Sequence, residues 1–184
     1  MPPLLLQILL FLLNLVFNFF ISLVLLRFFL QWVKADFYNP LCQFVMNMTN
    51  FALLPLRRII PGFLGVDCAA LILAILAQAA FLALVSLLTG LSFNGTEFTL
   101  TVLLHLASLL LNLYFFIIII HALLSFSTQA YRNALFQALS QLLAPLYRPI
   151  RRVIPPISGF DLSPLVVLIA IQILLMCIHS VGMI

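Results

Sequence analysis

The side chains best suited to polar chemistry lie in a thirteen-residue motif that occurs twice. Segment 55–67 reads PLRRIIPGFLGVD, and 94 residues later segment 149–161 reads PIRRVIPPISGFD. Adjacent guanidinium groups suit bidentate contacts to phosphate or carboxylate groups. The motif is therefore a candidate binding site for a lipid headgroup, an anionic ligand or a partner protein. Its two copies hold six of the 12 charged residues of the chain: Arg57, Arg58, Asp67, Arg151, Arg152 and Asp161.

The motif also allows a purely structural interpretation. Its prolines, with Gly65 and Gly159, predict a rigid, irregular elbow in each copy. An aspartate directly before a spanning helix can cap the first free N–H groups. The run Asp161-Leu-Ser-Pro164 supports such a cap, because proline is tolerated in a first helical turn. In this interpretation the arginines fix the cytoplasmic side, contact headgroups and pair with the aspartates.

A second set of polar side chains is expected near mid-membrane depth. Amide groups in hydrocarbon need partners, so this set predicts interhelical hydrogen bonds. The alternative is a polar pathway for water, an ion or a proton, although no acidic residue lies at that depth to carry a proton or a cation. The set consists of five amides with related positions in the two halves of the chain: Asn14, Asn18, Gln78, Asn112 and Gln172.

The remaining reactive side chains indicate no catalytic site. Cys42, Cys68 and Cys177 lack metal-binding spacing, and three cysteines give no disulfide framework. His105 and His179 are expected near the outer ends of their helices, where a haem or metal site would be the alternative to ordinary interfacial histidines. No nucleotide loop, nucleophile elbow or catalytic carboxylate pair is visible. We therefore expect no enzymatic activity, no cofactor and no metal.

These residues are carried by a very apolar chain. Of its 184 residues, 66% are hydrophobic and 7% are charged, whereas about a quarter are charged in soluble proteins. Uncharged runs such as 4–26 exceed the ~20 residues that a spanning helix needs and lack the alternation of barrel strands. The sequence predicts an all-α membrane protein with four transmembrane helices. No basic residue precedes the first run, so we expect it to remain as a helix rather than be cleaved as a signal peptide.

The duplicated motif divides the chain into two halves of one design. Each half crosses the membrane twice, so we expect parallel repeats related by a pseudo-two-fold axis along the membrane normal. The first repeat, 1–92, should contain a spanning helix 4–32, a short interfacial amphipathic helix 41–54, the elbow 55–67 and a spanning helix 68–91. A connection at 93–98, marked by the turn signal Asn94-Gly95, leads to the second repeat, 99–184, with the corresponding segments 99–126, 134–143, 149–161 and 162–181.

Residues near the membrane surface give further expectations. The first spanning helix should emerge into the interface through Arg27 and Trp32, and His121, which aligns with Arg27, should be interfacial as well. The interfacial helix 41–54 should be apolar along one side, formed by Leu41, Phe44, Val45, Met48 and Ala52.

Basic residues predict the orientation. The connection between the second and third spans carries only the acidic Glu97, whereas the other two connections are basic. By the positive-inside tendency both elbows should be cytoplasmic and both termini outside. The formal charge of +4 then indicates anionic headgroups as the nearest partners, rather than nucleic acid. The basic connections carry Lys34, Arg57 and Arg58, and Arg132, Arg148, Arg151 and Arg152.

The duplicated pattern resembles the YggT family, also called the YlmG family, of bacterial and plastid membrane proteins. The resemblance covers nearly the whole chain as a two-repeat member. The first copy has Cys68-Ala69-Ala70 where the second has Leu-Ser-Pro, and Ala134 stands where the first half has Pro40, so the halves need not be equivalent in binding. The resemblance is carried by Asn39-Pro40, Pro55-Leu-Arg57-Arg58-Ile-Ile-Pro61, Gly65-Val-Asp67, Pro149-Ile-Arg151-Arg152-Val-Ile-Pro155 and Gly159-Phe-Asp161-Leu-Ser163-Pro164.

The resemblance implies a multi-pass protein of the bacterial cytoplasmic (inner) membrane, associated with tolerance of osmotic or extracytoplasmic stress and, by gene neighbourhood, with cell division. Plastid relatives are linked to haem attachment to a cytochrome and to nucleoid distribution, and no enzymatic activity is established for the family. We expect a non-enzymatic scaffold or assembly factor that acts through its elbows on anionic lipid headgroups and on a membrane-protein partner or a second copy of the chain. The alternative is a component of an ion (potassium-like) or osmolyte transport system.

Overall fold

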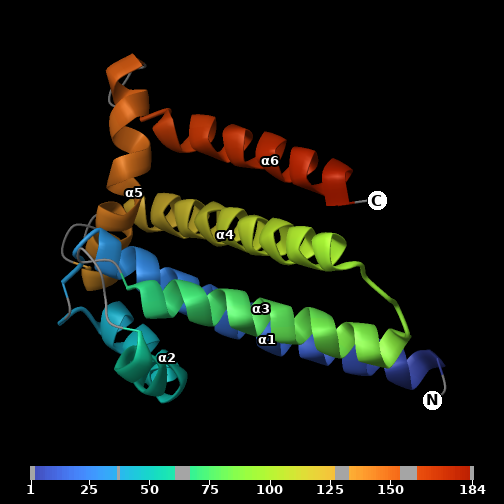
Figure 1. Ribbon diagram of the computed structural model, residues 1–184. Helices are drawn as coiled ribbons and strands as arrows, with labels where there is room; N and C mark the ends of the chain where they lie inside the picture. Colours follow the sequence, from blue (N-terminus) through green and yellow to red (C-terminus); the bar gives the residue numbers. More distant parts are fainter. Residues whose placement is uncertain (1–2, 37, 61–66, 127–132, 154–160, 183–184) are drawn as a thin grey trace. The chain divides into compact units, whose positions relative to one another are not determined.

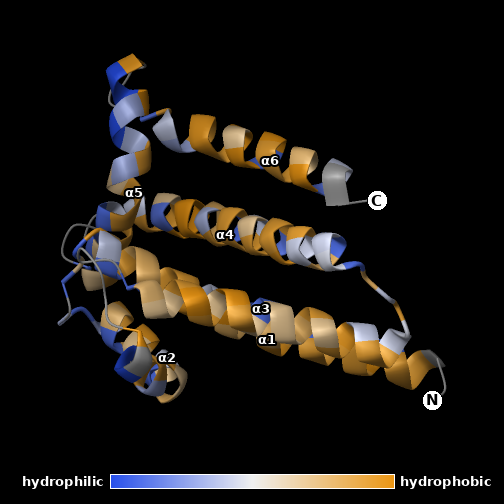
Figure 2. Cartoon of the chain, in the orientation of Figure 1, coloured by the Kyte–Doolittle hydropathy of each residue, from blue (hydrophilic) through white to orange (hydrophobic). Residues whose placement is uncertain are grey.

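A computed structural model describes residues 3–36, 38–60, 67–126, 133–153 and 161–182. These residues form helices and no strand (Figure 1), so the expected all-α class is confirmed. Four of the helices, α1, α3, α4 and α6, are long and apolar enough to cross a membrane, and hydrophobic residues dominate their length (Figure 2). In order the helices are α1 (Pro3–Trp32), α2 (Pro40–Ile59), α3 (Cys68–Thr89), α4 (Gly95–Ser125), α5 (Ala134–Val153) and α6 (Ser163–Gly182).

The chain divides into two compact units whose borders differ from those of the sequence repeat. The first unit comprises Met1–Phe28 and Val45–Leu110, and the second comprises Phe29–Phe44 and Leu111–Ile184. The end of α1 and the start of α2 thus belong with the second unit. There the Phe29 ring meets Tyr114 edge to face at 5.4 Å, and the Asn39 amide donates to the Ala134 carbonyl at 2.5 Å.

Packing in the first unit depends on small residues of α3. Ala69, Ala70 and Ala74 are fully buried, and small side chains let neighbouring membrane helices approach closely. The Phe17 and Phe81 rings, 5.4 Å apart, bring α1 against α3. The Phe20 and Phe51 rings, 5.6 Å apart, bring α2 against α1.

The ends of α3 and the start of α4 are built from local hydrogen bonds. Gly90 ends α3 in the left-handed conformation, with φ of +74°, and its N–H donates to the Ser86 carbonyl at 2.9 Å. The Asn94 N–H donates to the Glu97 carboxylate at 3.1 Å, the backward half of a capping box. Because of this cap α4 begins at Gly95, so the expectation that the connection extends to residue 98 is wrong.

The two interfacial helices are longer than the sequence predicts. Helix α2 continues through Pro55 to Ile59, and α5 continues through Pro149 to Val153, so the first residues of each elbow are helical rather than irregular. A proline removes one backbone donor but leaves the rest of the ladder intact, and arginines in a last turn complement the helix dipole. The other expected elbow residues, 61–66 and 154–160, lie outside the described residues.

The expected apolar side of α2 is buried only in part. Val45 is buried, whereas Phe44 and Met48 are each 47% exposed. The buried positions are three and four residues apart and include Thr49, whose hydroxyl donates to the Val45 carbonyl at 2.7 Å. That bond satisfies the hydroxyl and allows a polar residue on the inner side. The buried side consists of Cys42, Val45, Thr49 and Leu53.

Candidate functional site

The first copy of the motif folds into an ion pair that also caps a helix. One Asp67 carboxylate oxygen accepts from the Arg57 guanidinium, and the other accepts from the Ala70 N–H at 3.3 Å. The carboxylate side chain is 3% exposed and the arginine side chain 36%. Asp67 is therefore the N-cap of α3 and joins this helix to the end of α2. We call this arrangement of Arg57 and Asp67 the first clamp.

The second copy repeats the arrangement, and we call Arg151 with Asp161 the second clamp. One Asp161 oxygen accepts from Arg151 Nε at 3.0 Å and Nη2 at 2.5 Å, and the other accepts from the Ser163 N–H at 2.9 Å. Exposure is greater here, 51% for the arginine side chain and 29% for the aspartate. The expected pairing of arginines with aspartates is thus confirmed in both copies.

Electrostatics at the second clamp favour the charged carboxylate. Partial burial acts to raise the pKa of Asp161, but hydrogen bonds from Ser163 and Arg151, with the charge of the guanidinium, outweigh it and leave the pKa below its ordinary value. The Arg151 guanidinium also lies over the Tyr147 ring, 5.5 Å from its centroid. Burial, with the Asp161 charge, raises the pKa of Tyr147 to about 12, so its phenol is a neutral hydrogen-bond donor.

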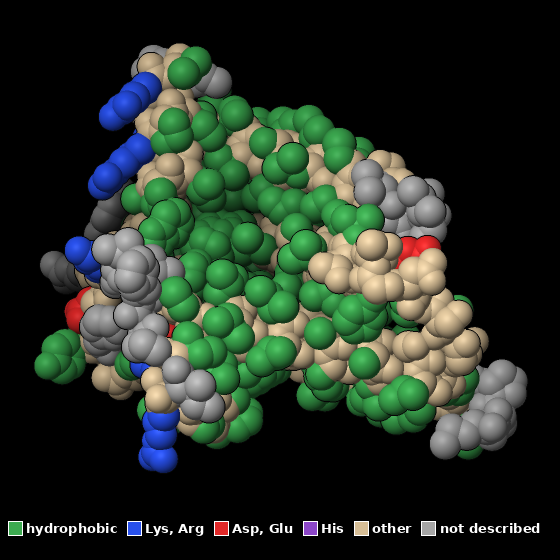
Figure 3. All heavy atoms as spheres, viewed as in Figure 1, with side chains coloured by type: hydrophobic (Ala, Val, Ile, Leu, Met, Phe, Trp, Pro, Cys, Tyr) green, Lys and Arg blue, Asp and Glu red, His purple; other side chains and the backbone are tan. Residues whose placement is uncertain are grey.

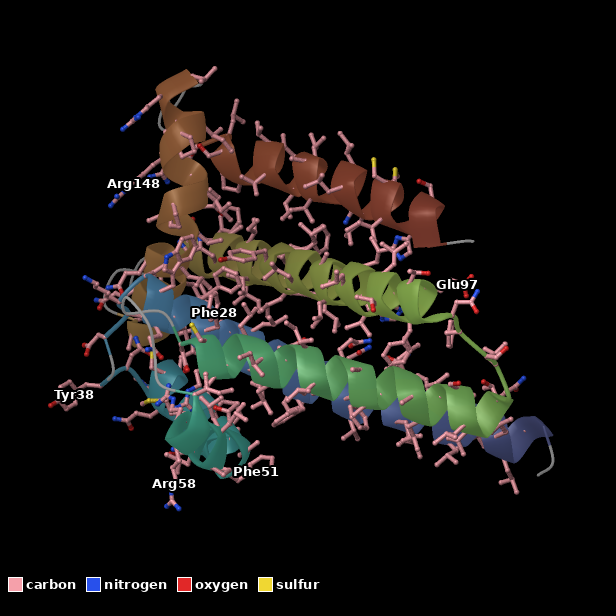
Figure 4. The ribbon with its side chains drawn as sticks, in the orientation of Figure 1. Phe28, Tyr38, Phe51, Arg58, Glu97 and Arg148 are labelled. Atoms are coloured by element: carbon pink, nitrogen blue, oxygen red, sulfur yellow. The ribbon has the colours of Figure 1, made fainter. Side chains whose placement is uncertain are left out.

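The second arginine of each motif is not part of a clamp. Arg58 and Arg152 are exposed, as is Arg148 one turn before Arg152. Among the residues that the structure describes, none of these three guanidinium groups has an ion-pair partner. Arg58 and Arg148 point outward from their helices (Figure 4). Each motif therefore holds one arginine in an ion pair, while the other has no ion-pair partner among the described residues.

Arg27 has a role that the sequence did not reveal. It is 6% exposed because it is buried against α2. Its Nη1 donates to Thr49 Oγ1 at 2.7 Å, to Asn50 Oδ1 at 2.9 Å and to the Met46 carbonyl at 3.3 Å. The guanidinium is turned inward because α2 offers these three acceptors, and it fastens α2 to α1. The sequence signal was weak, because Thr49 and Asn50 are two of several polar residues on α2.

His121, 94 positions after Arg27, occupies the corresponding place in the second repeat. Its ring stacks on Phe136 with centroids 4.5 Å apart, and Nε2 lies 2.9 Å from Ser140 Oγ. The Ser140 hydroxyl already donates to the Phe136 carbonyl at 2.7 Å, so Nε2 must be the protonated nitrogen that donates to Ser140. The neutral ring then keeps Nδ1 as an acceptor.

The amide set does not form the expected interhelical bonds at the positions that can be followed. The Asn18 amide donates to Asn14 one turn earlier in the same helix. Gln78 is completely buried, and among the described residues neither atom of its amide has a hydrogen-bond partner. Gln172, its counterpart, is exposed on α6, whereas Asn112 is half-buried on α4. Gln78 and Gln172 therefore differ in burial despite their matching positions.

The histidines and cysteines show no metal site in the part of the chain that the structure describes, where no three potential ligands come together. His179 Nδ1 bonds to the Leu175 carbonyl of its own helix at 2.8 Å. Cys42 is buried, and burial, with the charge of Asp36, raises the pKa of its thiol, which is therefore protonated and unreactive.

Comparison with known proteins reproduces the internal repeat. The family model described as CCB3/YggT matches residues 6–88 and again residues 100–182. An uncharacterized protein of Pseudomonas aeruginosa is 40% identical over 159 residues, which cover 85% of this chain and 81% of the relative. An uncharacterized Vibrio alginolyticus protein is 38% identical over 164 residues, covering 88% of each chain. The uncharacterized protein YggT of Escherichia coli is 33% identical over 171 residues, covering 93% of this chain and 89% of the relative. No solved structure matches.

Proposed function

The chain belongs to the CCB3/YggT family, and on that premise we propose that it is a non-enzymatic multi-pass scaffold or assembly factor of the bacterial inner membrane. It would act through its two arginine-bearing elbows and contribute to tolerance of osmotic or extracytoplasmic stress. The proposal rests on the difference between the two adjacent arginines of each motif. One arginine is held by a clamp while its neighbour, Arg58 or Arg152, is exposed.

The clamp gives the exposed arginine a defined position. Each clamp joins the last turn of an interfacial helix to the first turn of the next spanning helix. The neighbouring residue on the same helical turn is thereby held at the membrane surface. A guanidinium in that position can contact headgroup phosphates or an acidic segment of a partner protein.

Both elbows should face the same compartment. Two spanning helices, α3 and α4, lie between them in the sequence, so the chain returns to the side from which it left. The excess of basic residues in both connections favours the cytoplasm as that side and places both termini outside. A scaffold of this kind would present two similar cationic contacts to one partner or to two copies of it.

The proposal can be tested by complementation. In a bacterium lacking its own family member, the double variant R58Q/R152Q should reach the membrane in parental amounts but fail to restore growth under osmotic stress. Labelling of single introduced cysteines at positions 58 and 152, in a background without Cys42, Cys68 and Cys177, should place both on the cytoplasmic side. Full complementation by R58Q/R152Q, or labelling from opposite sides, would contradict the proposal.

The transport alternative has less support from the described residues. The Asn14–Asn18 bond lies within one helix, and Gln172 is exposed rather than paired within the protein. Ion flux into proteoliposomes separates the two functions. Flux by the parent that is abolished in N18L/N112L would replace the scaffold by a transporter.

A further inference from the structure

A cavity of about 910 Å³ lies beside α5 in the second unit. It is bounded by the end of α4, one side of α5 and the start of α6, and Figure 3 shows a hollow with hydrophobic walls beside α5. Its volume falls within the ~300–1,000 Å³ of small-molecule sites. The cavity is therefore large enough for a bound molecule rather than a few waters.

The lining of this cavity is apolar beside the spanning helices and polar beside α5. Phe126, Leu165 and Leu168, which lie in or next to membrane-spanning helices, form an apolar side. The interfacial helix α5 contributes Tyr147 and Arg151. Apolar walls beside the spans and polar groups at the interface match a molecule that has a hydrocarbon part and a headgroup and that enters from the bilayer.

The charges of the lining favour an anionic headgroup. The lining contains two guanidinium groups, those of Arg148 and Arg151, and one carboxylate, that of Asp161, so with His121 neutral its net charge is +1. Arg151 uses Nε and Nη2 for the second clamp, and Nη1 is not engaged there. Arg148 lines the cavity with its stem and extends outward at the rim, where a headgroup phosphate would lie (Figure 4).

Tyr147 lines the cavity, but its hydroxyl does not open into it. The residue is 3% exposed, and its hydroxyl is closed to solvent and has no hydrogen-bond partner among the described residues. Tyr147 therefore contributes contact surface to the site rather than a hydrogen bond to the bound molecule.

This polar lining is specific to the second repeat. The positions 94 residues earlier hold Leu53 and Leu54 in place of Tyr147 and Arg148. Leu53 is fully buried, and Arg27, at the place of His121, is tied to α2 by three hydrogen bonds. At the corresponding positions the first half thus has apolar side chains and an arginine bonded to α2, whereas the second half has polar side chains at the cavity.

We propose that the cavity beside α5 binds one anionic phospholipid, with its acyl chains against α4 and α6 and its phosphate at Arg148 and Arg151. The bound lipid would brace α6 against α4 and α5. This site uses neither Arg58 nor Arg152, so the lipid site and the proposed scaffold contacts can be tested independently of each other.

Native mass spectrometry of the purified full chain in detergent tests the proposal. The protein is titrated with phosphatidylglycerol, with phosphatidylcholine of the same acyl chains, and with glycerol 3-phosphate as a soluble source of the same phosphate. One phosphatidylglycerol should bind at least tenfold more tightly than phosphatidylcholine, and glycerol 3-phosphate should not compete. Equal binding of the two lipids, or equally tight binding of glycerol 3-phosphate, would overturn the assignment.

Two matched pairs of variants locate the bound lipid. L168W fills the cavity from α6, whereas I169W places the same ring on the adjacent exposed position, which does not line it. L168W should lower phosphatidylglycerol affinity at least tenfold and I169W should not. R148Q should weaken it about fivefold, the value of one juxtamembrane cation, and K34Q, which removes an equal charge outside the lining, should leave the single tight lipid in place. If both members of either pair behave alike, the lipid does not occupy this cavity.

Discussion

The two clamps have the same chemistry but different burial, so removing the carboxylate should destabilise the protein unequally. Asp67→Ala and Asp161→Ala each remove a helix cap and an ion pair. The Asp67 side chain is 3% exposed and that of Asp161 is 29% exposed, with arginine partners at 36% and 51%. We expect the larger loss of stability from Asp67→Ala.

The magnitude follows from the two parts of each clamp. Loss of a capping carboxylate costs about 1 kcal/mol in either copy. The buried Asp67 adds a hydrogen bond between charged groups, worth about 1.5–3 kcal/mol. The more exposed second pair adds only about 0.2–1 kcal/mol because solvent screens it. The expected totals are about 3 kcal/mol for Asp67→Ala and about 1.5 kcal/mol for Asp161→Ala.

Unfolding in mixed micelles by SDS titration, followed by helical circular dichroism, measures the difference. Asp36→Ala serves as the control, because Asp36 is an exposed residue outside both clamps whose carboxylate accepts from the Tyr38 N–H at 3.0 Å. A double-mutant cycle with Arg57→Met should recover most of the excess cost of Asp67→Ala as coupling energy. If Asp161→Ala proves as costly as Asp67→Ala, burial does not determine the strength of the clamps.

Three further predictions use the same titration. Gln78→Leu should stabilise the protein by roughly 1–3 kcal/mol, since it removes a buried amide that lacks partners among the described residues, and a destabilised variant would indicate a bound partner. Arg27→Met should destabilise the protein by about 1–3 kcal/mol, because it leaves the acceptors of α2 unpaired. Arg27→Lys keeps a charged donor and should cost less. Equal losses of stability in the two variants would show that the acceptors do not need a donor. The pKa of Asp161 is lowered in the folded protein, so its contribution to the free energy of unfolding should be complete above the ordinary aspartate pKa of ~3.9. That contribution should disappear as the pH falls through the lower pKa of the folded state. The difference in stability between the parent and Asp161→Ala should therefore vanish in acid and persist at neutral pH.

Features set by local sequence were predictable. Four apolar runs, the duplicated motif and the caps at Asp67 and Asp161 follow from composition, spacing and the chemistry of free N–H groups at a helix start. The pairing of each aspartate with the arginine ten residues earlier was also accessible, because the two charges flank one short connection. These features need no knowledge of which helices touch.

Features set by neighbouring helices were not predictable. The sequence alone indicates an interfacial position for Arg27 and does not reveal its three acceptors on α2. Thr49 lies on the buried side of α2 because it is one of these acceptors. Pro55 predicts the end of a helix, but α2 continues beyond it to Ile59. Gln78 and Gln172 have equivalent positions in the sequence, yet one is fully buried and the other exposed.

The contrast between Arg27 and His121 explains how two repeats of one design can differ in function. A buried guanidinium needs several acceptors, and in the first repeat Thr49 and Asn50 of α2 supply them. These hydrogen bonds fasten α2 to α1. A neutral imidazole needs fewer partners and is satisfied by Ser140 and by stacking on Phe136. The positions of Thr49 and Asn50 are accordingly occupied by the apolar Leu143 and Ala144 in the second repeat. The two repeats thus use different side chains to fasten the helix that follows the first span to that span, while the clamp beside them has the same chemistry in both.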